Sequence, residues 1–522
     1  MGIYFNPGNA SYRGDVNSRI YVDKTGLLEV LNRKIGSAER CLALSHARRF
    51  GKSQAAGMID AYYSRGSDSR ELFADKEIAK SPDFEKYLNK YNVIHLDISS
   101  VYDTHKLDLI QEIGKRLVED FRESYGENLD YGKDIYLLIN DIYKKDGRTF
   151  VIIIDEWDCI IRNMADNKKL VHEYLQFLHT LFKSEESKSF LALGYITGIL
   201  PIKKIKDESA LNNFKEYTML KSGELTPYFG FTEDEVKALC DEYHMEFESV
   251  RQWYDGYRIN GIDMYNPNSV YQAMVDHDLD SYWRNTSAFD TINTYITLNY
   301  DGLKDDVIKM LKGGKVRVDT YGFSNDFSEI TSKDDALTAL IHLGYLAYDN
   351  GKAYIPNYEV GIAYKLALRK SGWNEVARSI VLCDELLDET IEGNAARVAE
   401  IIELSHEAYT SILEYNDENS LSCVITMAYF TAPAYYSVIR ELPSGKGYAD
   451  IVMIPRKDTK NMPPILVELK YDKDADSAIR QIHEKRYTGA LKGLNDEVIV
   501  VGVNYDPKTK AHECVIEKID ML

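Results

Sequence analysis

The segment "RCLALSHARRFGKSQAAGMIDAYYS", residues 40–64, indicates how the first part of the chain folds. It opens with a short apolar run typical of a buried strand and closes with a pattern typical of a helix. Between the two stands Gly51-Lys52-Ser53, which ends like a loop that binds phosphate groups. In such a loop, backbone N–H groups surround the phosphates, a lysine reaches the terminal ones and a hydroxyl holds Mg²⁺. His46 occupies the position of the usual first glycine.

A second apolar strand ends in two acids about a hundred residues after the loop. The segment "FVIIIDEWD" (150–158) places Asp155 and Glu156 at its end. An aspartate there can hold Mg²⁺ with the loop hydroxyl, and a glutamate directly after it can polarise an attacking water as general base. The alternative, a buried strand capped by two solvated acids, is weaker because the loop precedes it. Thr197 ends a further strand and either contacts a ligand there or caps the next turn.

Length and periodicity predict several domains. A chain of 522 residues is expected to form two to four. Helical patterns, for example at 170–184, separate the apolar runs in the first part of the chain and predict an α/β domain over 1–205. A mostly helical region follows over 206–360, with a hairpin turn at 349–351, and a third domain covers 361–522. The predicted parallel strands of the first domain are 40–45, 92–99, 149–155 and 190–198.

Composition narrows the class of protein. A net charge of −20 argues against nonspecific coating of nucleic acid, but it leaves room for a local basic cleft or for a metal that bridges acids to phosphate. No run of about 18 apolar residues and no signal peptide is found, so we expect a cytoplasmic protein without a membrane partner. The six cysteines are far apart and form no C-x-x-C pair, which favours reduced thiols over a zinc site.

The C-terminal part holds a second group of charged residues. Asp450 lies early in the strand 447–455, and Glu468 and Lys470 lie in the strand 465–472. Alternation along a strand puts Glu468 and Lys470 on one face. Two carboxylates suit Mg²⁺ or Mn²⁺, and a lysine beside them can steer a metal-bound water or steady the pentacovalent phosphate. Exposed charges on an edge hairpin are the alternative, although Glu468 interrupts an apolar run.

Several blocks of the N-terminal part resemble the AAA-ATPase-like family over about residues 5–290. The resemblance implies a P-loop NTPase (AAA-like) domain whose loop lacks its first glycine, although His46-Ala47 departs from the usual Arg-Pro. Arg48 and Arg49 then belong to the loop, where they add charge near the phosphates or pair with a neighbouring acid; we favour the pairing for at least one of them. The blocks are "YVDKT" (21–25), "ARRFGKS" (47–53), "IIIDEWD" (152–158), "TGILPI" (197–202), "LNNF" (211–214), "YFGFTEDEV" (228–236), "WYDGYR" (253–258), "YNPNSV" (265–270) and "YWRNTS" (282–287).

The C-terminal part looks like a PD-(D/E)XK nuclease domain over roughly 415–510. Its predicted order of elements is α-β-β-β-α-β, ending with the helix 474–493 and the strand 497–506. The resemblance implies a restriction-endonuclease-like α/β domain in which Glu418 is a helix-borne acid beside Asp450, Glu468 and Lys470. Gln481 and Tyr487 match a Q-x(5)-Y element of such domains, or they support the sheet structurally.

The leading hypothesis is an ATP-binding and ATP-hydrolysing protein coupled to a metal-dependent nuclease-like domain that acts on DNA or RNA. A nucleotide switch with a non-cleaving C-terminal binding module is the alternative, and ATP binding without hydrolysis is a third. Oligomerisation stays open. The expected ligands are ATP, Mg²⁺ and, at the C-terminal site, Mn²⁺. The expected nucleotide-binding residues are Arg49, Phe50, Gly51, Lys52, Ser53, Gln54, Asp155 and Thr197; the catalytic residues are Glu156, Glu468 and Lys470; and the metal ligands are Ser53, Asp155, Glu418, Asp450 and Glu468.

Overall fold

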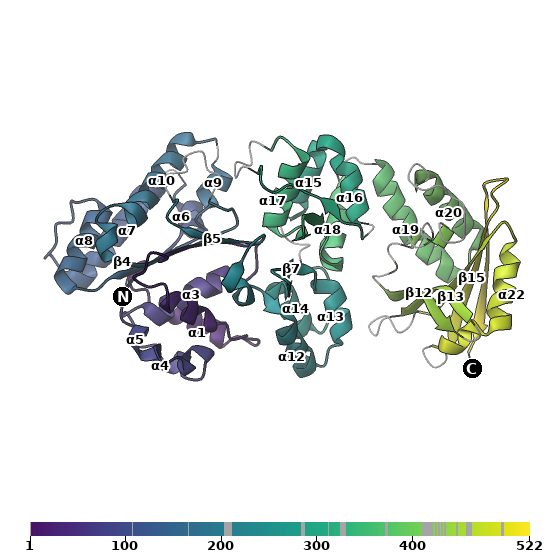
Figure 1. The fold of residues 1–522 in the computed structure, drawn as a ribbon, viewed down its shortest axis with the longest axis horizontal. Coiled ribbons are helices and arrows are strands. Elements are labelled where there is room, and N and C mark those ends of the chain that lie inside the picture. The colour runs from purple at the N-terminus through teal and green to yellow at the C-terminus, as the bar shows by residue number, and fades with distance from the viewer. Residues whose placement is uncertain are drawn as a thin grey trace. The chain divides into compact units, whose positions relative to one another are not determined.

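The chain divides into two compact units, Met1–Gly361 and Ile362–Leu522 (Figure 1). Glu418 lies outside the residues that the structure describes, so its predicted role is not tested here. The computed structural model describes residues 2–106, 108–164, 166–202, 211–282, 288–311, 313–323, 330–370, 374–409, 421–422, 425, 428–429, 432, 435–444, 447–455, 462–491 and 495–521.

The first unit is built on a parallel sheet of five strands in the order β2-β3-β4-β1-β5. The four predicted strands are present, and the short polar strand β5 adds a fifth at the edge. One strand, β4, therefore separates the loop strand β1 from the acidic strand β3. The bounds are β1 Cys41–Ser45, β2 Asn92–Asp97, β3 Phe150–Asp155, β4 Leu191–Gly198 and β5 Lys215–Thr218.

Helices cover both faces of this sheet, which explains why its central strands are apolar throughout. In β3, Ile152 and Ile154 pack into the core cluster beneath α7, α8 and α10, whereas Val151 and Ile153 pack against α2 and α3 (Figure 1). The helices are α1 Ala10–Val16, α2 Gly26–Asn32, α3 Lys52–Tyr63, α4 Arg70–Phe73, α5 Phe84–Tyr87, α6 Ile98–Thr104, α7 Leu109–Tyr125, α8 Ile135–Asp146, α9 Cys159–Asn163, α10 Lys168–Lys183 and α11 Ser187–Phe190, with the 3-10 helix η1 Glu77–Lys80.

The rest of the first unit is mostly helical, as predicted, and also contains two small antiparallel sheets, in the orders β6-β8-β7 and β10-β11-β9. The predicted hairpin turn is present, because Asp349 pairs with Lys352 and both Asn350 and Gly351 have positive φ. The elements are η2 Gly223–Tyr228, β6 Phe231–Thr232, α12 Glu233–Tyr243, α13 Phe247–Tyr254, β7 Tyr257–Ile259, β8 Ile262–Tyr265, α14 Pro267–Asp276, α15 Ala288–Leu298, η3 Tyr300–Gly302, α16 Leu303–Leu311, β9 Val316–Arg317, α17 Lys333–Leu343, β10 Ala347–Asp349 and β11 Lys352–Tyr354. Helix α18 Tyr358–Lys370 begins in the first unit and continues into the second.

The second unit is a mixed sheet in the order β12-β13-β14-β15-β16, in which only the β14–β15 pair is parallel. Helices α19 and α20 supply the core on one face and α22 on the other. The predicted helix 474–493 is interrupted at Arg486, whose φ is positive, and β16 extends the predicted order. The bounds are α19 Asn374–Glu392, α20 Ala395–Tyr409, β12 Tyr436–Ser444, β13 Gly447–Pro455, β14 Ile465–Tyr471, α22 Ala475–Lys485, η7 Tyr487–Leu491, β15 Glu497–Tyr505 and β16 His512–Asp520.

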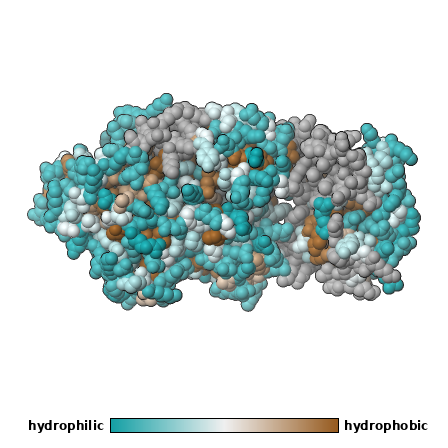
Figure 2. Space-filling view, viewed as in Figure 1, coloured by the Kyte–Doolittle hydropathy of each residue, from teal (hydrophilic) through white to brown (hydrophobic). Residues whose placement is uncertain are grey.

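Figure 2 shows one face of the molecule, on which hydrophilic residues dominate and hydrophobic ones form small separate areas. Across the described ranges, none of the helices is both long enough and apolar enough to cross a bilayer. This agrees with the absence of a long apolar run in the sequence.

Candidate nucleotide site and candidate nuclease site

The loop between β1 and α3 makes its turns at Arg49 and Gly51. Both residues have a positive φ, 68° and 84°, and Gly51 is the N-cap residue of α3. Glycine adopts this conformation at little cost, whereas an arginine in it is strained. Strained residues of this kind concentrate at functional sites. The loop therefore ends at the N-terminus of a twelve-residue helix, whose free N–H groups and dipole attract anions.

His46, in place of the first glycine, packs the loop onto its neighbours. Its side chain is fully buried, with its ring 5.1 Å from that of Phe50 and 6.0 Å from that of Phe229. Its Nε2 lies 3.3 Å from the Ser222 hydroxyl oxygen. Burial, together with the charge of Lys52, lowers the pKa of His46 to about 3, so the ring is neutral. His46 thus acts as a packing residue beneath the loop.

The loop residues meet the end of β3 at the carboxyl edge of the sheet. The Lys52 side chain is buried, and its Nζ donates to the carbonyl oxygen of Ala47 at 2.9 Å. The Asp155 carboxylate is 5% exposed; burial raises its pKa, and the nearby Ser53 hydroxyl opposes this rise. A buried carboxylate beside a hydroxyl is a donor set that fits Mg²⁺. The structure thus brings together the two residues predicted to hold this ion.

Thr197 ends β4 between the loop and the acidic strand. Its side chain is fully buried, and its hydroxyl has no hydrogen-bond partner in the part of the chain that the structure describes. The predicted capping of the following turn is therefore not seen. Its backbone carbonyl accepts from Trp157 N at 3.0 Å, which fixes the chain just after Glu156.

Glu156 is part of an ion-pair network that sequence reasoning missed. Arg162 on α9 donates from Nη2 to Glu156 Oε2 at 2.6 Å and from Nε to Asp158 Oδ2 at 2.8 Å. Burial raises the pKa of Glu156, and the charges of Lys52 and Arg162 oppose this rise. The spacing Asp158–Arg162 is i, i+4, a signal for an ion pair on a helix that was available in the sequence.

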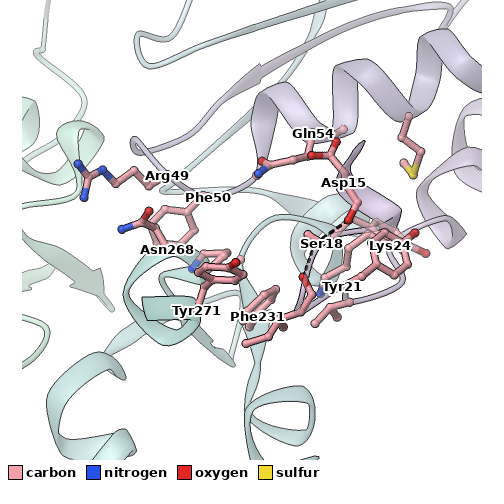
Figure 3. A pocket seen from close by; sticks show the side chains of 18 of the residues that line it. Asp15, Ser18, Tyr21, Lys24, Arg49, Phe50, Gln54, Phe231, Asn268 and Tyr271 are labelled. Atoms are coloured by element: carbon pink, nitrogen blue, oxygen red, sulfur yellow. Dashed lines mark hydrogen bonds between the residues drawn. The ribbon is translucent and has the colours of Figure 1, made fainter. Parts of the chain in front are cut away.

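Two pockets lie on either side of the loop and share Arg49, Gly51 and Gln54. The polar one, of about 430 Å³, is also lined by Lys52 and Ser53. The other, of about 480 Å³, is lined by the buried side chain of Phe50 and by aromatic rings from several elements, which Figure 3 shows around the cavity. These rings belong to Tyr12, Tyr21, Tyr228, Phe231 and Tyr271.

Arg49 connects the loop with the helical region of the first unit. Its Nη1 donates to the carbonyl oxygen of Tyr282 at 3.0 Å, and Tyr282 N donates to Glu359 Oε1 at 2.7 Å. For Arg49, the predicted pairing with a nearby acid takes the form of an electrostatic influence on Glu359. Glu359 is 1% exposed, and burial raises its pKa to about 8.

Glu359 is expected to make the stability of the first unit depend on pH. Its folded pKa of about 8 exceeds its usual value of 4.5, so the folded state holds a proton that the unfolded state has lost between these values. Stability contributed by this proton is present below pH 4.5 and is lost as pH rises toward 8. We predict that the free energy of unfolding of wild type falls between pH 6 and pH 8, and that about 2 kcal/mol of this fall is absent in Glu359→Gln.

Urea unfolding at the two pH values measures this difference for wild type and variant. Glu29→Gln, at an exposed position on α2, is the matched control and should retain the wild-type slope. An unchanged slope in Glu359→Gln would show that Glu359 is ionised throughout this range.

The predicted acids of the second unit meet where two strands separate. The ladder between β13 and β14 ends at the pair Ile451–Val467, one residue before Asp450 and Glu468. Beyond it, the Asp450 side chain replaces a backbone acceptor, because its Oδ2 accepts from Leu469 N at 2.8 Å. The point at which β13 separates from β14, here called the fork, therefore places Asp450 close to Glu468 and Lys470 on β14.

Glu468 and Lys470 lie on the face of β14 that α22 covers. Lys470 Nζ lies 3.1 Å from Glu468 Oε1 and 2.9 Å from the carbonyl oxygen of Leu469. Gln481 Nε2 donates to the same Glu468 oxygen and also to the Tyr487 hydroxyl oxygen at 3.3 Å. Four of the residues singled out in the sequence thus form one hydrogen-bonded group with Asp450 beside it.

The two carboxylates fit a divalent cation. Burial and the charge of Asp450 raise the pKa of Glu468 to about 7. Glu468 Oε2 is buried and has no hydrogen-bond partner among the residues that the structure describes. Both features are expected of a carboxylate whose natural partner is a metal ion. Within the described ranges, no group of three residues capable of holding a metal is found; the predicted third ligand, Glu418, lies outside them.

Comparison with known proteins finds a different family in each of the two units. A family model described as "Predicted AAA-ATPase" matches residues 15–206, and one for the PD-(D/E)XK nuclease superfamily matches residues 416–514. An uncharacterised protein in the vnfD 5′ region of Azotobacter chroococcum mcd 1 is 22% identical over 282 residues. The match covers 51% of this chain and 50% of that protein, so the chain spans about half the length of its curated relative.

Two solved structures show a weaker likeness. A Walker-type ATPase of Pyrococcus abyssi is 13% identical, with 66% of this chain and 94% of that chain covered and a TM-score of 0.33. The ORC2 protein of Aeropyrum pernix is 10% identical, with 67% and 96% covered and a TM-score of 0.32. Because these TM-scores are low, the fold is assigned from the sheet orders and the family matches and not from these two structures. The chain combines a predicted AAA-ATPase domain at residues 15–206 with a domain of the PD-(D/E)XK nuclease superfamily at residues 416–514.

Proposed function

We propose that the first unit binds ATP and hydrolyses it. The observation that carries this proposal is the convergence of Lys52, Ser53, Asp155 and Glu156 at one edge of the sheet, beside a polar pocket. The triphosphate would lie in this pocket, and the nucleoside would cross the loop into the aromatic pocket on its other side. The shared lining residues Arg49, Gly51 and Gln54 support this placement, because a single ligand would contact them from both sides.

Each residue of the site then has a distinct task. Lys52 exchanges the Ala47 carbonyl for the terminal phosphates and neutralises their charge. Ser53 and Asp155 would hold Mg²⁺, which when bound supplies further positive charge to the phosphates. Glu156 orients the attacking water and accepts its proton. Thr197, with its unsatisfied buried hydroxyl, offers one further hydrogen bond at the edge of the sheet.

We propose that the second unit is a metal-dependent nuclease-like domain that acts on nucleic acid. The fork between β13 and β14, which places Asp450 beside the buried Glu468–Lys470 pair, is the observation that carries it. Asp450 and Glu468 would hold Mg²⁺ or Mn²⁺, and Lys470 would orient the attacking water. Gln481 and Tyr487 position the Glu468 carboxylate through their hydrogen bonds.

Loss of the loop lysine tests the nucleotide-binding part. We predict that Lys52→Ala weakens ATP binding by about 100-fold, because a charged donor to the phosphates is removed. Isothermal titration of the full chain with ATP and Mg²⁺ measures this loss. Lys188→Ala, which removes an exposed lysine on α11, should bind like wild type. Equal affinity of Lys52→Ala and wild type would reject the assignment of this loop to the phosphates.

A further inference from the structure

Arg162 is a charged residue of the nucleotide site with no assigned role. Its guanidinium holds two acids at once: Nε bonds to Asp158 and Nη2 to Glu156. The Glu156 contact, at 2.6 Å, is the short one expected for a charge-assisted hydrogen bond. Glu156, whose carboxylate is proposed to accept a proton from water, therefore forms an ion pair with Arg162.

The same guanidinium faces the place proposed for the phosphates. Arg162 lines the polar pocket with Lys52, Ser53 and Glu156, and its side chain is 12% exposed. Among the described residues, its Nη1 forms no hydrogen bond. The charge of Arg162 also acts on Lys52, because Arg162 is among the groups that lower the pKa of that lysine. A terminal phosphate in this pocket would meet two cations.

Asp158 fixes one side of the guanidinium. Its side chain is fully buried, and its Oδ2 accepts from Ile199 N at 3.2 Å and from Leu200 N at 2.9 Å. These bonds tie the start of α9 to the segment after β4, so the Asp158–Arg162 contact belongs to the framework. Glu156, by contrast, is 23% exposed and lines the pocket, whereas Asp158 is fully buried. Of the two contacts, the one with Glu156 is the one that a ligand can replace.

We propose that Arg162 senses the terminal phosphate: in the empty site it holds Glu156, and a nucleoside triphosphate takes over the guanidinium and releases Glu156 for its work on water. This inference rests on the proposed ATPase function. Asp158 keeps its bond to Nε in both states, Nη2 exchanges Glu156 for the terminal phosphate, and Nη1 gains a bond to the same phosphate. A diphosphate, which lacks the terminal group, leaves the ion pair in place.

Competition for one guanidinium has a measurable consequence. A change at Glu156 that weakens its pair with Arg162 must strengthen triphosphate binding, because the phosphate no longer has to displace the carboxylate. Glu156→Gln is therefore expected to bind the triphosphate about 10-fold more tightly than wild type, and this gain depends on Arg162. Removal of a negative charge near the phosphates also favours binding, but that effect persists without Arg162.

The experiment is a double-mutant cycle on the full chain. The dissociation constants of the β,γ-imido analogue of ATP and of ADP are measured by isothermal titration with Mg²⁺ for wild type, Glu156→Gln, Arg162→Gln and the double variant. Arg162→Gln should lose about 10-fold in affinity for the analogue and less than about 2-fold for ADP. In the double variant, the gain from Glu156→Gln should fall to the smaller part that the lost negative charge alone explains. Arg122→Gln, which removes an arginine paired with Glu127 on the surface, is the control.

Three results would overturn the inference. They are an equal loss of analogue and ADP affinity in Arg162→Gln, a gain from Glu156→Gln that is as large in the double variant as with Arg162 present, and no gain in Glu156→Gln. If Arg162→Gln does not fold, Arg162→Lys carries the test, because an ammonium keeps the charge beside Asp158 but cannot hold Asp158 and the phosphate together; its preference for the analogue over ADP should then fall. Failure of wild type to bind either nucleotide would instead reject the proposed ATPase function, and this inference with it.

Discussion

Glu156→Gln is expected to abolish ATP turnover and to leave ATP bound. The amide has nearly the same shape as the carboxylate but cannot accept a proton from the attacking water. Loss of a general base lowers the rate by about 100-fold to 10,000-fold. Because Lys52, Ser53 and Asp155 are unchanged, the phosphates keep their partners. Phosphate release under saturating ATP measures turnover, and titration with ATP measures binding.

The control for this experiment is Glu127→Gln, which changes an exposed glutamate of the same unit and should hydrolyse ATP like wild type. Turnover by Glu156→Gln at the wild-type rate would show that another group accepts the proton. Wild type that binds ATP and never hydrolyses it would support the alternative of a nucleotide switch.

Glu468→Gln and Lys470→Ala are each expected to lower the rate of nucleic-acid cleavage in the presence of Mn²⁺ by about 100-fold or more. The first variant removes the charge of a proposed metal ligand with little change of shape. The second removes the ammonium that lies 3.1 Å from the same carboxylate. Gel assays with single-stranded and double-stranded DNA and RNA measure cleavage and at the same time identify the substrate.

Glu517→Gln serves as the matched control, because Glu517 lies on β16 of the same unit and pairs with His483 on the surface. Full activity in Glu468→Gln would place the metal elsewhere. Wild type that binds nucleic acid but cuts none of these substrates with Mg²⁺ or Mn²⁺ would identify the second unit as a binding module.

Local patterns predicted much of the fold because the relevant forces act between near neighbours. The four apolar runs of the first domain are strands, since a strand that is covered on both faces must be apolar on both. The turn at Asn350-Gly351 was predictable because both residues tolerate positive φ. The edge strand β5 was missed, since its polar sequence carries no such signal.

The candidate sites show where local reasoning stops. Alternation placed Glu468 and Lys470 on one face, but only the separation of β13 from β14 brings Asp450 to them. The residue types in the sequence singled out Asp155 and Glu156 as candidates. They did not predict that Arg162 binds Glu156, because the position of Arg162 depends on how α9 packs after the strand. An ion pair between neighbouring elements has no signature in either element alone.

The sequence by itself determined the four apolar strands of the first domain, the loop proposed to bind phosphate and the candidate acids, because periodicity, turn chemistry and ligand chemistry are properties of short segments. Only the tertiary structure decided that His46 is a buried, neutral packing residue and that Arg49 reaches a carbonyl 233 positions away. It also decided that Glu156 faces a cation before any nucleotide is present. Burial and partners are set by contacts between distant segments, which no local pattern contains.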